Sequence, residues 1–94
     1  MELEPQNARG LRGLGFIAMK KGQCPEAVRF YKSSTQSDAG NADGWAGLGQ
    51  AYLCMQDLAQ AEAALRKAQS IDPNNPTVKK SLELLRGRNA SGGR

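Results

Sequence analysis

The fold is decided by residues 45–75, WAGLGQAYLCMQDLAQAEAALRKAQSIDPNN, which hold two helical patterns separated by a short polar break. In the first pattern the apolar and small residues recur at helical spacing: Trp45, Leu48, Gly49 and Tyr52. The second pattern has the same kind of spacing: Ala61, Leu65 and Ala68. Residues at such spacings share one face of a helix, and the proline at 73 ends the second helix. The stretch therefore predicts a helical hairpin, closely packed where Gly49 faces Ala61.

The spacing W-x2-L-G-x2-Y, followed by A-x3-L and a proline, resembles the tetratricopeptide repeat (TPR) at nearly every signature position. The exception is Leu65, which stands where the family usually has Phe. Counted from residue 42, the unit ends at Asn75 and has the 34-residue period of the family. The resemblance implies an all-α fold, a right-handed superhelical solenoid of stacked antiparallel helical hairpins.

A degenerate copy of the same unit precedes it by one period. The motif L-x2-L-G-x2-A beginning at Leu11 aligns with the motif beginning at Trp45, and A-x3-Y at 27–31 aligns with A-x3-L at 61–65. We therefore expect one TPR repeat at 8–41 and a second at 42–75.

The two ends of the chain continue the pattern. LEPQN at 3–7 resembles IDPNN at 71–75, so residues 1–7 are interpreted as the end of a preceding repeat in a longer array; a natural N-terminus of similar composition is the alternative. Val78, Leu82 and Leu85 share one helical face and predict a helix at 76–87. This helix would cover the second hairpin, either as a cap or as the first helix of a truncated third repeat. The Gly-rich segment 88–94 is predicted to be disordered.

Composition restricts the function classes. The 94 residues carry 13 basic and 9 acidic side chains, a net charge of +4, which permits acidic partners. Nucleic-acid binding is disfavoured because the basic residues are not interleaved with exposed aromatic residues. No apolar run is long enough to cross a membrane and no signal peptide is present, so we expect a cytoplasmic protein without membrane contact.

The sequence offers little for catalysis. It has no histidine, which excludes a Cys-His or Ser-His catalytic pair and disfavours a zinc site, and no carboxylate pair has the spacing of a general acid and base. We expect no enzyme activity, no metal and no cofactor.

The two cysteines allow two interpretations. Cys24 and Cys54 are free thiols if the protein resides in a reducing compartment. Alternatively they form a disulfide, because Cys24 opens the second helix of one hairpin and Cys54 closes the first helix of the next. Those two ends lie on the same side of a stacked array.

Helix geometry predicts a binding surface. Residues at positions 2, 5, 9, 12 and 13 of each first helix lie away from the core and line a concave groove when hairpins stack. The candidate groove residues have a basic end, an apolar floor and one amide: Arg9, Arg12, Phe16, Met19, Lys20, Gln50, Leu53, Lys80 and Leu84. Such a surface suits an extended or helical peptide with acidic groups. Phe16 could instead pack on a neighbouring repeat or on a second copy of the chain.

Two further expectations concern the aromatic residues and one known class of TPR ligand. We expect the core to contain Tyr31, Trp45 and Tyr52. Chaperone-adaptor TPR proteins hold a C-terminal carboxylate between Lys, Asn and Arg residues at set positions. Arg12 could replace the Lys, but the other four of these positions here hold Phe16, Gly47, Thr77 and Ser81. This departure argues against binding of heat-shock-protein tails.

The leading hypothesis is therefore a protein-interaction module or scaffold that binds a peptide or helix of another protein in its concave groove. The alternative is an architectural spacer, or a segment of a longer array that self-associates through exposed stacking faces.

Overall fold

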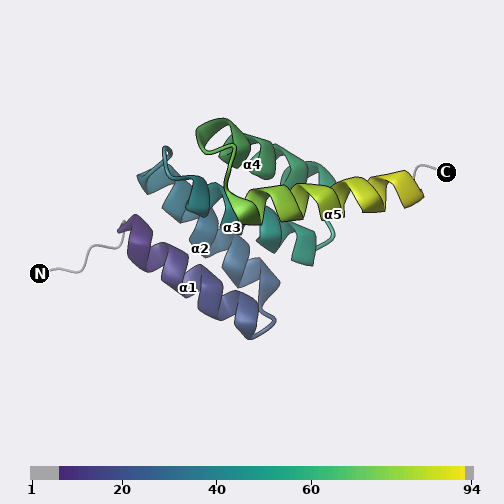
Figure 1. Cartoon of the computed structure of the whole chain (residues 1–94). Coiled ribbons are helices and arrows are strands. Elements are labelled where there is room, and N and C mark those ends of the chain that lie inside the picture. The colour runs from purple at the N-terminus through teal and green to yellow at the C-terminus, as the bar shows by residue number, and fades with distance from the viewer. Residues whose placement is uncertain (1–6, 93–94) are drawn as a thin grey trace, which may run out of the picture.

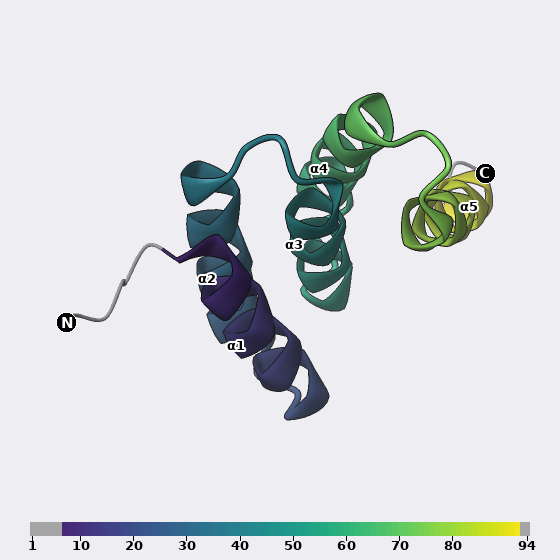
Figure 2. The same cartoon turned by 60° about the vertical axis from the view of Figure 1, so that its left-hand side comes forward.

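The structure, a computed structural model, describes residues 7–92, with side chains as far as residue 87. Within these residues it contains five helices and no strand: α1 Ala8–Lys20, α2 Cys24–Ser37, α3 Ala42–Cys54, α4 Leu58–Ile71 and α5 Pro76–Gly92. Figure 1 shows α1 and α2 as one antiparallel hairpin, α3 and α4 as a second, and α5 crossing in front of α3. Figure 2 shows the two hairpins side by side as successive layers, with α5 on the far side of the second hairpin. The predicted all-α stack of hairpins is confirmed.

The first helix of each unit begins at an asparagine that recurs with the 34-residue period. The Asn7 side chain accepts a hydrogen bond from the Gly10 amide, and Asn41 accepts one from the Asp43 amide. Asn75 accepts from the amides of Thr77 and Val78 at the start of α5. Each cap satisfies backbone N–H groups that the helix itself leaves unpaired, so it fixes where the helix starts.

The turn inside each hairpin also repeats. Gly22 has φ +77° and Gln56, one period later, has φ +64°. A left-handed residue here reverses the chain between the two helices of a hairpin. Glycine adopts this conformation without steric cost, whereas Gln56 does so against a preference of about 1–2 kcal/mol.

Close packing between helices depends on glycines facing large side chains. A Cβ atom added at Gly49 would lie 2.6 Å from Cγ of Leu65, so only glycine lets α3 approach α4 this closely. Ala61, fully buried, faces the same contact. The predicted close approach at Gly49 and Ala61 is confirmed.

Tyr31 fills the junction between the two hairpins. Its ring lies against Gly15 of α1, where an added Cβ would lie 2.8 Å away, and against Gly47 of α3, where an added Cβ would overlap it. Tyr31 is 6% exposed and belongs to the core cluster around Leu48. One side chain from α2 therefore holds α1 and α3 at once.

The last helix covers the second hairpin as its apolar face predicts. Val78 and Leu85 are buried and Leu82 is half-buried against Ala42, Ala46 and Ala68 of the second hairpin. The helix continues to Gly92, five residues beyond the expected end at 87. No proline interrupts residues 87–92, and a glycine inside a helix costs only about 1 kcal/mol relative to alanine. Of the segment predicted to be disordered, residues 93–94 lie outside the described part of the chain.

Burial differs between equivalent positions of the two repeats. Leu14 occupies the repeat position of Leu48, yet it is 46% exposed while Leu48 is 4% exposed. The reason is that α2 covers that face of α3, whereas among the described residues no helix covers the corresponding face of α1. Ile17 is exposed for the same reason, although Ala51 at the equivalent position is buried.

The interpretation of residues 1–7 as a repeat end concerns, apart from Asn7, residues outside the described range. Among the described residues, no helix is both long and apolar enough to cross a membrane.

Candidate functional site

A hollow of about 320 Å³ lies on the face where α1, α3 and α5 come together. Met19 contributes from α1, three residues from α3, and two residues from α5. Its lining residues are Met19, Gln50, Leu53, Cys54, Ser81 and Leu84. Leu84 is 60% exposed and Gln50 is exposed, so an apolar side chain and a free amide are both available to a ligand. We call this the concave hollow.

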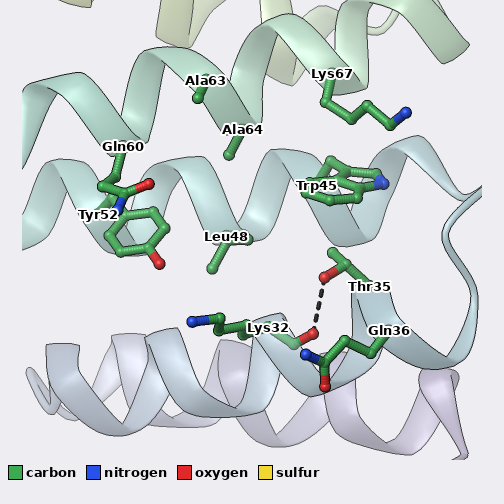
Figure 3. Close-up of a pocket in the computed structure, with 10 residues that line it drawn as sticks. All are labelled: Lys32, Thr35, Gln36, Trp45, Leu48, Tyr52, Gln60, Ala63, Ala64 and Lys67. Atoms are coloured by element: carbon green, nitrogen blue, oxygen red, sulfur yellow. Dashed lines mark hydrogen bonds between the residues drawn. The ribbon is translucent and has the colours of Figure 1, made fainter.

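A larger depression of about 440 Å³ lies on another side of the molecule, between α2 and α4 with α3 as its floor (Figure 3). Its lining residues are Lys32, Thr35, Gln36, Trp45, Leu48, Tyr52, Gln60, Ala63, Ala64 and Lys67. No Cα atom of α2 lies within 8 Å of one in α4, so the space between these helices stays open. We call it the α2–α4 furrow.

The floor of the furrow corrects the expectation that Trp45 and Tyr52 are core residues. Both are only half-buried and pack beside the core cluster, whereas Tyr31 is a core residue as expected. The Trp45 indole N–H donates to the carbonyl of Ala39 at 2.8 Å, and Nζ of Lys67 lies 5.9 Å from the centroid of its ring. The indole is thus held in one orientation with a lysine over it.

The two cysteines are joined. Their Cα atoms lie 6.0 Å apart, and the disulfide between Cys24 and Cys54 connects the start of α2 with the end of α3. Of the two interpretations of the sequence, the structure has the disulfide and not the free thiols. Cys54 also lines the concave hollow, so the bridge between the hairpins borders that site.

The phenol of Tyr31, between the two hairpins, has a shifted pKa. Burial raises the pKa of its phenol above the ordinary value of 10.0, and the nearby Arg12 guanidinium partly opposes this rise. Nε of Arg12 is itself buried and has no hydrogen-bond partner among the described residues. Arg12 is therefore half-buried beside the core and is not a freely exposed groove cation.

The comparison with protein families gives a match to the profile described as "Tetratricopeptide repeat" over residues 18–85. The chain belongs to the tetratricopeptide repeat family. The match spans most of both hairpins and of α5, and it agrees with the resemblance carried by the motif at Trp45. TPR domains typically serve as protein–protein interaction modules and are generally not catalytic.

Solved TPR structures resemble this one in fold. The first TPR of Spaghetti (RPAP3), bound to the HSP90 peptide SRMEEVD, superposes with a TM-score of 0.51 at 17% identity, over 96% of this chain and 98% of that one. The TPR domain of Arabidopsis OM64 gives a TM-score of 0.47 at 19% identity, over 86% and 95% of the two chains. A comparison with curated proteins finds no match.

The TPR structure brings together part of the predicted groove. Four of the nine predicted residues line the concave hollow: Met19, Gln50, Leu53 and Leu84. Phe16 is 56% exposed on α1, with Nζ of Lys20 5.4 Å from its ring centroid. Arg9 and Lys80 are also exposed but, like Phe16 and Lys20, do not line the hollow. The predicted residues thus form a small hollow with basic and aromatic side chains outside it.

The α2–α4 furrow was missed by sequence reasoning. The signature residues Trp45 and Tyr52 are predicted to be core residues because helical spacing predicts a shared face, not how completely that face is covered. The sequence feature that could have indicated the furrow is the pair of lysines on the second helices, Lys32 and Lys67, which lie near that face. Among the described residues, no three His, Cys, Asp or Glu side chains cluster closely enough to hold a metal ion.

Proposed function

We propose that the concave hollow binds a peptide or a helix of a partner protein. The observation that supports the proposal is the convergence of Met19, Leu53 and Leu84, from three different helices, on one hollow beside the exposed amide of Gln50. Apolar side chains provide surface to bury, and an amide can both donate to and accept from a peptide backbone. Lys20 and Lys80 near this face favour a ligand with acidic groups.

The proposed ligand differs from the tail of a heat-shock protein. The similar RPAP3 domain is bound to an HSP90 peptide, but that likeness concerns the fold alone. In this chain Tyr31 fills the space above Gly47, so no asparagine side chain fits at that position. Ser81 is buried and carries no charge. We infer an acidic segment held mainly by apolar contacts and not through a terminal carboxylate clamp.

The test uses peptides selected from a random library on the whole chain and then measured in solution. Leu84→Glu places a charge in the hollow without removing a buried contact, and it should weaken binding of the selected peptides about tenfold or more. Ile17→Glu is the matched control, because Ile17 is exposed to a similar degree but lies on α1 outside the hollow. Equal binding by both variants and the wild type would overturn the proposal.

A second candidate function rests on Leu14 and Ile17, which form an exposed apolar face on α1. In the second hairpin the same positions are covered by a neighbouring helix, so this face is suited to stack on another hairpin, including one from a second copy. If Ile17→Glu rather than Leu84→Glu abolishes peptide binding or dissociates an oligomer seen by light scattering, self-association is the better account.

A further inference from the structure

We propose that the α2–α4 furrow is a second binding site, which takes a short acidic peptide segment with one bulky apolar side chain. This site is separate from the concave hollow. The two share only α3, and they use opposite faces of it: Trp45, Leu48 and Tyr52 in the furrow, Gln50, Leu53 and Cys54 in the hollow. A ligand in one therefore leaves the other accessible.

The dimensions of the furrow suit a short peptide. Its floor extends from Trp45 to Tyr52, about 10 Å along α3 at 1.5 Å per residue, which matches about three residues of an extended chain. Figure 3 shows these side chains along α3, with α2 on one side and α4 on the other. The volume of about 440 Å³ accommodates one large side chain together with its flanking backbone.

The chemistry of the lining selects the side chain and the backbone of the ligand. The accessible apolar surface comes from the exposed Ala63 and the half-buried Trp45 and Tyr52, so it favours an aliphatic or aromatic side chain at the centre. Thr35 already donates its hydroxyl to the carbonyl of Lys32 at 2.8 Å. Two exposed amides, Gln36 and Gln60, have no such side-chain bond among the described residues and can pair with a peptide backbone.

The charges on the two rims select acidic neighbours. Lys32 stands on α2 and Lys67 on α4, both exposed, and none of the described residues that line the furrow carries a carboxylate. The acid on this part of α4, Glu62, pairs with Arg66 at 2.7 Å and so does not neutralise Lys67. Carboxylates on either side of a central apolar residue would meet one lysine each.

A nucleic acid suits the furrow less well. Stacking of bases needs a free aromatic face, and Lys67 lies over one face of the Trp45 ring. Two lysines on opposite rims also provide less charge than a groove that follows a phosphate backbone. The peptide is therefore the occupant that we test, and an oligonucleotide serves as a competitor.

Trp45 makes the test direct, because it is the single tryptophan of the chain and lies in the furrow floor. The probe is the capped peptide acetyl-EEFDE-amide, titrated against the whole chain while tryptophan emission is followed. We expect saturable binding with a change in emission. The analogues acetyl-EEGDE-amide and acetyl-KKFKK-amide should bind at least about tenfold more weakly, since each lacks one of the two recognised features. Absence of saturation by the probe, equal binding of either analogue, or tighter binding of oligo-dT would overturn the proposal.

Matched variants assign the signal to the furrow. Ala63→Leu fills the furrow from an exposed position and should weaken probe binding about tenfold, while Ala59→Leu, the same change at an exposed position of α4 outside it, should not. Lys32→Glu should weaken binding more than Lys21→Glu, which alters the net charge equally. Helical circular dichroism verifies that each variant is folded.

A further variant distinguishes binding of the probe in the furrow from binding in the concave hollow. Leu84→Glu should leave acetyl-EEFDE-amide binding unchanged, because Leu84 does not line the furrow. Loss of probe binding in Leu84→Glu, with Ala63→Leu unaffected, would overturn the furrow proposal and support the hollow instead.

Discussion

At the scale of single residues, Tyr31 has the widest influence. It contacts α1 at Gly15 and α3 at Gly47, and its position rules out a side chain at either glycine. Its phenol is removed from water there, which raises its pKa despite the nearby Arg12. The packing between the two hairpins and the ionisation of the Tyr31 phenol are therefore coupled.

This coupling predicts a loss of stability at alkaline pH. The folded state holds the Tyr31 proton more tightly than the unfolded state, so the contribution of this group is fully present below pH 10. It decreases as pH rises above the unfolded pKa and through the raised folded pKa. The unfolding free energy, measured by urea titration at a series of pH values, should therefore fall above about pH 10.

Tyr31→Phe isolates this effect because it keeps the ring and removes the ionisable group. The variant should show a shallower decline above about pH 10 than the wild type, since lysine titration affects both chains equally. Parallel pH profiles for the two chains would mean that the phenol ionises as easily in the folded state as in the unfolded one.

At the scale of helices, the asparagine caps determine where each repeat begins. Asn75 has the largest role, since it is 8% exposed, caps α5, and donates from its side-chain amide to the Asp43 carboxylate at 3.1 Å. That last bond joins the start of α5 to the start of α3. This buried amide thus adds to the packing of Val78 and Leu85 in placing the final helix on the second hairpin.

Asn75→Ala should lower the unfolding free energy by about 1–2 kcal/mol, the cost of an N-cap together with a lost side-chain hydrogen bond. The measurement is chemical denaturation followed by circular dichroism. Asn74→Ala is the matched control: its side chain is exposed, makes no hydrogen bond in the described structure, and should change stability little. A loss in Asn75→Ala no greater than in Asn74→Ala would show that the cap does not hold α5.

The sequence predicted these helices well where local chemistry determines them. Pro73, the 34-residue period of the motif and the apolar face of Val78 and Leu85 predict where the helices lie. Burial was predicted less well. Leu14 and Leu48 have the same helical spacing, and only the presence of α2 on one side of α3 makes Leu48 a core residue. Such coverage depends on neighbours along the array, which periodicity within one helix does not encode.

At the scale of the whole molecule, binding surfaces arise between hairpins. The concave hollow could be predicted in part because the inner residues of stacked first helices follow a simple positional rule. The furrow could not, since it depends on the distance between α2 and α4. That distance follows from the packing of Tyr31 and the small residues of α3, which no single motif specifies.

The disulfide that joins the two hairpins should contribute to the stability of the fold. Cys24 and Cys54 are 30 residues apart in the sequence. Closing a loop of this length lowers the conformational entropy of the unfolded chain and so raises its free energy by about 3–4 kcal/mol. Reduction with dithiothreitol should lower the unfolding free energy by this order. The double variant Cys24→Ser, Cys54→Ser should show the same loss of unfolding free energy, and adding dithiothreitol should not change its stability further.

Reduction should also weaken peptide binding in the concave hollow, because Cys54 lines the hollow whereas neither cysteine lines the α2–α4 furrow. A hollow bordered by the bridge loses its fixed spacing between the end of α3 and the start of α2 when the bridge opens. Peptides selected on the hollow should therefore bind the reduced chain more weakly under conditions in which circular dichroism shows it folded, while the Trp45 emission of the furrow changes little. Equal stability and equal peptide binding before and after reduction would mean that packing alone, chiefly at Tyr31, holds the hairpins together.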